Sequence, residues 1–241
     1  TGIPSSKEYL IKSLEIDPFH PRFLSGLVYY HLKNNSLQEA RNAFRKLFPV
    51  YPDAIDVFAE NLFRNEVELK TFGNKLEEAP NASIRFAIFL YRNGHKELAA
   101  RQIEKTPEDK LVEMNPSWAG IILNDVGKTD EALRILEKAW LEKDETDAWL
   151  GKNLADVYEQ EGEMEKALQI WQAVLEQSPG NPEWNIGLAR VAHKGGRPEL
   201  ALRHYHKVTA NRDAQDRYRK KAYLGIAKIK KEHNKYKEAR Q

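Results

Sequence analysis

The sequence of 241 residues contains no cysteine. Without cysteine there can be no disulfide, no thiolate-bound metal and no cysteine nucleophile. No run of 18 apolar residues occurs, so we expect no insertion into a membrane. The first six residues show neither the basic region nor the apolar core of a signal peptide. These absences fit the cytoplasm and the bacterial periplasm equally well, so they leave the compartment open.

Motifs for catalysis are also missing. The seven histidines form no His-Glu-X-X-His motif. His204 and His206 are two positions apart, which places them on different faces of a predicted helix. Gly195 and Gly196 follow no predicted strand, so they indicate a turn between helices rather than a phosphate-binding loop. We therefore predict a protein that is not an enzyme and that needs no cofactor and no metal ion.

The net charge is only +2, but the charges are unevenly distributed. From Arg203 to Gln241 there are 13 Lys and Arg against 4 Asp and Glu, a net charge of +9. The preceding 202 residues carry a net charge of −7. An asymmetry of this size is informative about binding partners.

A pattern of small, aromatic and turn-forming residues is clearest in the middle of the second half of the chain. Leu154 and Tyr158 are four positions apart and share one face of a helix. Gly162 suits the positive φ angle that ends a helix, and Trp171 fills the space between neighbouring helix pairs. The markers of this unit are Leu154, Ala155, Tyr158, Gly162, Ala167, Trp171 and Pro179.

The same pattern recurs in at least six registers, at spacings of 33 to 38 residues. Unrelated amphipathic helices would not keep small residues and turn glycines in phase, so the recurrence indicates a repeat architecture. The later markers are Leu188, Ala189, Gly196, Ala201 and Tyr205, then Ile226, Ala227, Asn234, Tyr236 and Ala239. The earlier markers are Ala119, Gly120, Leu123, Gly127, Ala132 and Leu136, then Phe86, Ala87, Leu90, Gly94, Ala99 and Ile103, then Leu27, Asn35, Ala40, Phe44, Leu47 and Pro52.

This pattern resembles that of the tetratricopeptide repeat (TPR) family, over most of the chain apart from residues 53–80. The resemblance implies an all-α fold, a right-handed superhelical solenoid of antiparallel helix pairs. It also implies that the first helix of each pair lines a concave surface on which a protein or peptide partner binds.

We predict three regions along the chain. Residues 1–52 hold N-terminal TPR units, of which the first is truncated. Residues 53–80 form a degenerate short helical unit, because the glycine and alanine markers are absent there. Residues 81–241 hold the C-terminal TPR units, with a loop between Pro107 and Pro116 and a truncated last unit whose second helix starts after Asn234. Since complete arrays end in a polar capping helix, we expect a fragment of a longer array, with apolar ends through which it could oligomerise.

The inner-face positions of the family predict a groove that changes character along the chain. It is apolar and aromatic near the N-terminus, polar in the middle and basic at the end. A partner segment with an apolar part and an acidic part would complement this gradient. The predicted partner-binding residues are Tyr29, Ile84, Ile88, Tyr91, Asn124, Lys152, Asp156, Arg190, His193, Lys194, Lys228 and Lys231.

Three functions remain open from the sequence. The first is a protein-interaction scaffold, with a bacterial envelope or polysaccharide-export assembly as its suggested setting. The second is binding of a polyanion or nucleic acid by residues 203–241, where basic residues alternate with tyrosines. The third is a docking arm for an enzyme outside this sequence. The basic segment could also be no more than a solvated helix face, and the sequence does not name the partner, the organism or the pathway.

Overall fold

The computed structural model describes residues 6–76, 79–143 and 147–238. Within these ranges every regular element is a helix, as the sequence predicted. No helix among the described residues is both long and apolar enough to cross a membrane. The chain divides into two compact units, Thr1–Gly127 and Lys128–Gln241.

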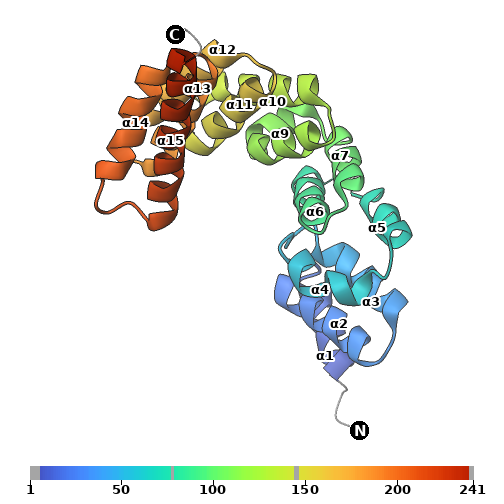
Figure 1. Cartoon of the computed structure of the whole chain (residues 1–241). Helices are drawn as coiled ribbons and strands as arrows, with labels where there is room; N and C mark the ends of the chain where they lie inside the picture. Colours follow the sequence, from blue (N-terminus) through green and yellow to red (C-terminus); the bar gives the residue numbers. More distant parts are fainter. Residues whose placement is uncertain (1–5, 77–78, 144–146, 239–241) are drawn as a thin grey trace. The chain divides into compact units, whose positions relative to one another are not determined.

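The first unit contains helix pairs joined by short turns (Figure 1). The pairs α2–α3 and α6–α7 pack most closely, while α4, α5 and α8 are short. Its helices are α1 (Ser6–Ile16), α2 (Pro21–Lys33), α3 (Leu37–Leu47), α4 (Ala54–Leu62), α5 (Glu66–Gly73), α6 (Pro80–Arg92), α7 (Lys96–Glu104), α8 (Glu108–Met114) and α9 (Pro116–Asp125).

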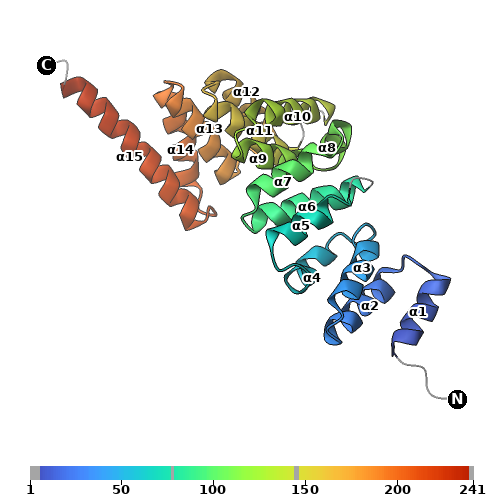
Figure 2. The same ribbon diagram turned by 90° about the vertical axis from the view of Figure 1, so that its right-hand side faces the viewer.

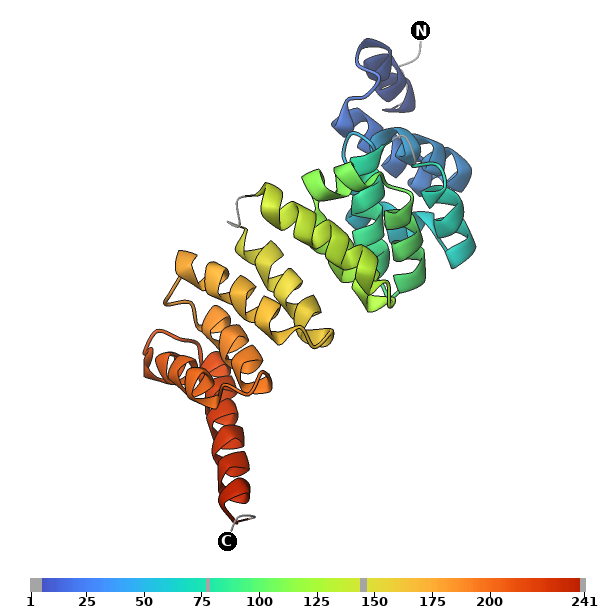
Figure 3. The ribbon, with the colours of Figure 1, turned by 90° about the horizontal axis from the view of Figure 1, so that it is seen from above.

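The second unit is more regular. Each helix from α11 onward packs against the next, and Figure 3 shows α11 to α14 side by side. Figure 2 shows α15 along its length. The helices of this unit are α10 (Thr129–Glu142), α11 (Ala148–Gln160), α12 (Met164–Gln177), α13 (Pro182–Lys194), α14 (Pro198–Ala210) and α15 (Asp216–Glu238).

The predicted turn markers take the backbone geometry that their residue types favour. Gly162, between α11 and α12, has a φ angle of 81°, in the left-handed region that only glycine enters without steric cost. Asn35, which stands in the glycine place of the first complete pair, has a φ angle of 55°. Asparagine tolerates this region better than most residues, so the prediction of a turn at Asn35 is confirmed.

The packing predicted for the small and aromatic markers is also confirmed in the second unit. Ala155 and Ala167 are fully buried, and Trp171 is 1% exposed. A contact that the sequence analysis did not anticipate recurs three times here: a glycine of a first helix lies against an aromatic ring of the preceding second helix. The three contacts are Gly151 with Trp140, Gly187 with Trp171, and Gly225 with Tyr205.

The degenerate unit at residues 53–80 is built from two short helices, α4 with nine residues and α5 with eight. Phenylalanine rings replace the glycine and alanine contacts of the regular units. Phe72 of α5 is the centre, with ring centroids at 5.5 Å from Phe44, 5.0 Å from Phe63 and 5.2 Å from Phe86. The boundaries at residues 52 and 80 remain a prediction.

Two local predictions are wrong. The predicted loop between Pro107 and Pro116 contains α8, whose Leu111 and Val112 are buried. Proline is well suited to the start of a helix, and the acidic residues after Pro107 favour a helix N-terminus. The predicted turn at Asn234 is absent, since α15 continues through it to Glu238. Without glycine there, and with strong helix formers such as lysine and glutamate around it, helical geometry is retained.

Candidate partner-binding groove of the second unit

Three first helices of the second unit, α11, α13 and α15, border a hollow of about 500 Å³. Its floor combines apolar side chains with two glycines, and its rim is charged. The floor residues are Trp171, Ile186, Gly187, Tyr205, Leu224 and Gly225. The rim residues are Lys152, Asp156, Glu183, Arg190, Lys221 and Lys228.

The two glycines explain how aromatic rings from α12 and α14 reach this floor. A Cβ atom on Gly187 would lie 2.5 Å from the ring of Trp171, and one on Gly225 would lie 2.3 Å from the ring of Tyr205. Only glycine lets the rings approach the helix backbones so closely. Burial raises the pKa of the Tyr205 hydroxyl above its ordinary value.

A network of ion pairs joins α11 to α13. The carboxylate of Asp156 lies 2.7 Å from Lys152 Nζ and 2.7 Å from Arg190 Nη2. Glu159, whose side chain is 2% exposed, lies 2.8 Å from Arg190 Nη1 and 2.6 Å from Lys194 Nζ. A buried carboxylate needs such partners to offset the loss of hydration. The cations that the sequence assigned to partner binding here are therefore already paired with acids of α11.

His193 also serves the packing of the unit. Its Nε2 lies 2.8 Å from Glu232 Oε2, and its side chain is mostly buried. The contact ties α13 to α15. It leaves little of the imidazole free for a partner.

The lysines of α15 differ from those of α11 and α13. Lys221 and Lys228 are exposed at the rim, and Lys231 is exposed one helical turn further on. Among the described side chains, none forms an ion pair with these three ammonium groups. The positive charge that is free to meet a partner's carboxylate therefore lies on α15.

The predicted groove residues of the first unit fall into different environments. Tyr29 of α2 is 65% exposed, and Asn124 of α9 is partly exposed. The Tyr91 hydroxyl donates to Asp125 Oδ2 at 2.6 Å, and Lys96 Nζ lies 2.7 Å from the same oxygen. Burial and this hydrogen bond raise the pKa of Tyr91 to about 12. Hydrogen bonds from Lys96 and Tyr91 lower the pKa of Asp125.

Ile84 and Ile88 are not displayed on a surface. They are 3% and 4% exposed, because α6 is packed by α4, α7, α8 and α9. The helix is apolar around most of its circumference, which is typical of a buried helix. Their assignment as partner-binding residues is corrected to a role in the core.

The pairing of the cations was not predicted, although the sequence holds a signal for it. Asp156 and Arg190 are 34 positions apart, which is one repeat length, and they form an ion pair between adjacent first helices. Tyr91 and Asp125 are also 34 apart and share a hydrogen bond. In a repeat array, residues one period apart occupy the same place on neighbouring units, so complementary residues at that spacing predict contacts.

Comparison with known proteins agrees with this architecture. The tetratricopeptide repeat model matches residues 123–174 and 160–222. The chain is similar to the crystal structure of YrrB, "a TPR protein with an unusual peptide-binding site", with 16% identity, a TM-score of 0.51, and 85% of this chain and 92% of that chain covered. It is also similar to MamA 41-end from Desulfovibrio magneticus RS-1, with 17% identity, a TM-score of 0.52, and coverage of 81% and 97%.

A third similar structure is the APC/C hetero-tetramer Cut9-Hcn1, with 15% identity, a TM-score of 0.51, and coverage of 92% of this chain and 38% of that chain. At these identities the structures show the fold alone. The fold is that of the class of helical-repeat proteins built from antiparallel helix pairs. Within that class, this chain resembles the tetratricopeptide repeat family, whose model matches it over residues 123–222.

Proposed function

We propose that this protein binds a segment of a partner protein in the hollow of the second unit. The segment places an apolar side chain against Ile186 and Leu224, and a carboxylate next to it reaches Lys221 or Lys228. The observation that carries the proposal is an apolar floor open to solvent beside unpaired lysines. Leu224 is 71% exposed, so this part of the apolar lining is accessible to a partner.

The two kinds of contact have different roles. Burial of apolar surface contributes about 25 cal/mol per Å², so the floor supplies most of the affinity. Each exposed ion pair contributes about 0.2–1 kcal/mol, so the lysines mainly set orientation and the rate of association. A carboxylate would have to displace Asp156 or Glu159 to reach Arg190, so we assign Arg190, Lys152 and Lys194 to the scaffold rather than to recognition.

The wider setting is part of the same proposal. YrrB is described as having an unusual peptide-binding site, which supports a peptide-like occupant for this chain as well. We place the complex in a larger assembly, with a bacterial envelope or polysaccharide-export complex as the first to test. A catalytic role is not proposed. If the protein serves instead as a docking arm for an enzyme, we expect that enzyme to bind in the same hollow.

A second candidate function is polyanion binding by α15. The exposed cations of this helix favour it. Tyr223 is 59% exposed among them and could stack on a base. The exposed basic residues of the described part of this helix are Arg217, Lys220, Lys221, Lys228, Lys230 and Lys231.

Two double variants separate the candidates. Lys221→Glu with Lys228→Glu reverses charge at the rim of the hollow, and Lys220→Glu with Lys230→Glu makes the same change on exposed positions of α15 that do not line it. Proteins captured from a lysate of the source organism are identified by mass spectrometry. The affinity of the purified partner is then measured for both variants at 50 and 200 mM salt.

Partner binding predicts that the rim variant weakens binding about tenfold or more, while the control variant stays within about twofold of the parent. Binding should also survive 200 mM salt, since apolar burial provides most of it. Equal losses in both variants, with loss of binding at 200 mM salt and capture of nucleic acid, would support the polyanion candidate instead.

A further inference from the structure

The second helices of the first unit are unusually short beside the degenerate repeat. Helix α5 has eight residues and α7 has nine, whereas α12 has 14 and α14 has 13. At 1.5 Å per residue, α5 is about 9 Å shorter than α12. The side chains that a full-length helix would supply are missing, and α6 is incompletely covered at this place.

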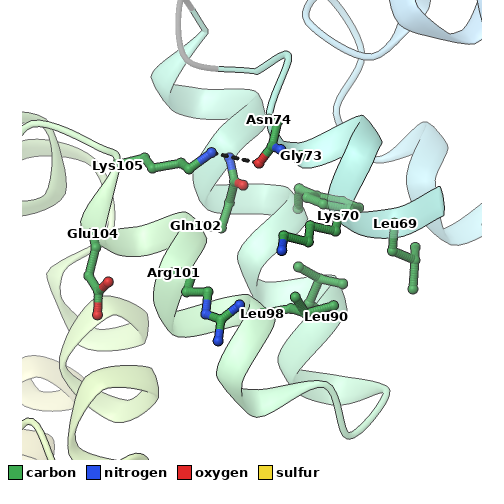
Figure 4. Close-up of a pocket in the computed structure, with 11 residues that line it drawn as sticks. Leu69, Lys70, Gly73, Asn74, Leu90, Leu98, Arg101, Gln102, Glu104 and Lys105 are labelled. Atoms are coloured by element: carbon green, nitrogen blue, oxygen red, sulfur yellow. Dashed lines mark hydrogen bonds between the residues drawn. The ribbon is translucent and has the colours of Figure 1, made fainter. Parts of the chain in front are cut away.

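The uncovered region is a hollow of about 250 Å³ between α5, α6 and α7 (Figure 4). Its floor is apolar, formed by Leu69, Phe86, Leu90 and Leu98. Small-molecule sites usually have volumes of about 300–1,000 Å³, so this hollow suits one large side chain better than a cofactor. It is built mainly by second helices and so is separate from the surface that first helices line.

The inner end of the hollow is rigidly held. Gly73 approaches so closely that a Cβ atom there would lie 2.7 Å from Gln102 Oε1 and 2.9 Å from the Phe86 ring. Gln102 Nε2 donates to Ser83 Oγ at 2.6 Å, and the Thr106 hydroxyl lies 3.2 Å from the same oxygen. A floor fixed in this way loses little conformational freedom when a side chain enters.

The lining of the hollow carries more positive than negative charge, with Lys70, Arg101 and Lys105 against one acid, Glu104. In Figure 4 the side chains of Lys70, from α5, and Arg101, from α7, reach toward the region beside Leu90 and Leu98. Both cations are exposed, and no described acidic side chain forms an ion pair with either. Lys105 differs, because its Nζ donates to Asn74 Oδ1 at 2.7 Å. Two like charges at one apolar opening are complementary to a carboxylate placed between them.

We propose that this hollow is a second protein-docking site, which takes one large apolar side chain of a partner segment with an acidic residue next to it. The apolar chain fills the space over Leu98, and the carboxylate lies between Lys70 and Arg101. The site does not depend on the hollow of the second unit, so either proposal can fail while the other holds. A nucleic acid is a poor match, because the opening is too small for a base stacked on its neighbours and its floor is apolar.

The test uses the whole chain, labelled with ¹⁵N, and short peptides as probes. The first probe is acetyl-Gly-Leu-Asp-Gly-amide. Acetyl-Gly-Leu-Asn-Gly-amide removes its charge, and acetyl-Gly-Ala-Asp-Gly-amide removes its large side chain. Inorganic phosphate provides an anion alone. Amide shift changes locate each probe, and titration gives its dissociation constant.

The Leu-Asp peptide should shift the amides of Gly73, Leu98 and Arg101 and bind about three to ten times more tightly than either control peptide. The Lys70→Glu, Arg101→Glu variant should remove the preference for aspartate over asparagine. Leu98→Trp should fill the hollow and abolish binding of the leucine probes. A matched Lys12→Glu, Lys33→Glu variant changes exposed lysines of α1 and α2 and should bind as the parent does.

Three results would overturn the proposal. Shifts confined to α11, α13 and α15 would place the peptide in the other hollow. Equal affinity for the aspartate and asparagine peptides would show that Lys70 and Arg101 do not recognise the carboxylate. Equal response to phosphate and to the Leu-Asp peptide would mean that the apolar floor is not used. Circular dichroism of each variant confirms that the helices are intact.

Discussion

At the scale of the residue, glycine decides how closely neighbouring repeats pack. Gly187 lies against Trp171, where a Cβ atom would come within 2.5 Å of the ring. Gly187→Ala should therefore lower the free energy of unfolding by about 1–3 kcal/mol, the usual cost of overpacking a core. Urea unfolding measures this change. Gly180→Ala is the matched control, since nothing lies within 4 Å of a Cβ there. An equal loss of stability at both glycines would show that the ring contact is not responsible.

His204 gives the second unit a dependence on pH. It is 8% exposed, and its Nδ1 lies 2.9 Å from Asn185 Oδ1. Burial lowers its pKa to about 4, whereas an unfolded histidine titrates near 6.5. Between these values the unfolded chain binds more protons than the folded chain, so stability falls as the pH drops from 6.5 toward 4.

The predicted loss from this one histidine is about 2 kcal/mol between pH 7.5 and pH 5. The measurement is urea unfolding at both pH values for the parent and for His204→Gln. The variant is expected to be less sensitive to the change in pH by that amount, whatever its stability at pH 7.5. The same sensitivity in parent and variant would mean that His204 is protonated in the folded chain or that it titrates normally.

At the scale of the element, α15 has one packed face and one open face. Ala222, Ile226 and Ile229 are buried against α13 and α14, while Tyr223 and Leu224 are exposed. Ile226→Ala should cost about 2–4 kcal/mol of stability, as for other buried aliphatic truncations. Leu224→Ala should leave stability within about 0.5 kcal/mol of the parent but weaken partner binding by about 1–2 kcal/mol. Unfolding and binding measured on both variants would separate the faces. If Leu224→Ala binds the partner as the parent does, the partner does not contact the apolar floor of the hollow at this residue.

The elements also show what the sequence can and cannot predict. Turn markers such as Asn35 and Gly162, and buried markers such as Trp171, were predictable because one local requirement selects each residue type. The continuation of α15 past Asn234 was not, since a repeat pattern alone does not say whether a second helix is there to fold back. Site chemistry was the least predictable. Whether Arg190 is free or paired depends on Glu159, and only the packing of α11 against α13 decides that.

At the scale of the whole molecule, stability in a repeat protein is a sum of the intrinsic terms of its units and the interfaces between neighbours. A substitution that destabilises one repeat should therefore affect mainly that repeat and its direct neighbours. In Gly187→Ala, the amides of α12, α13 and α14 should exchange with deuterium more rapidly, because these helices meet at the altered contact. Amides of α2 and α3 should exchange at the parental rate, since their opening does not require α13 to open.

Exchange that accelerates equally in α2–α3 and in α12–α14 would contradict this expectation and would mean that the chain opens as one cooperative body. The distinction bears directly on binding. If the units open independently, a partner that occupies only the hollow of the second unit should protect α11 to α15 and leave α5 to α7 unchanged. The Leu-Asp peptide, which we place against α5, α6 and α7, should give the opposite pattern of protection. Exchange measured with each occupant alone would then assign each hollow to its own ligand, without relying on any substitution.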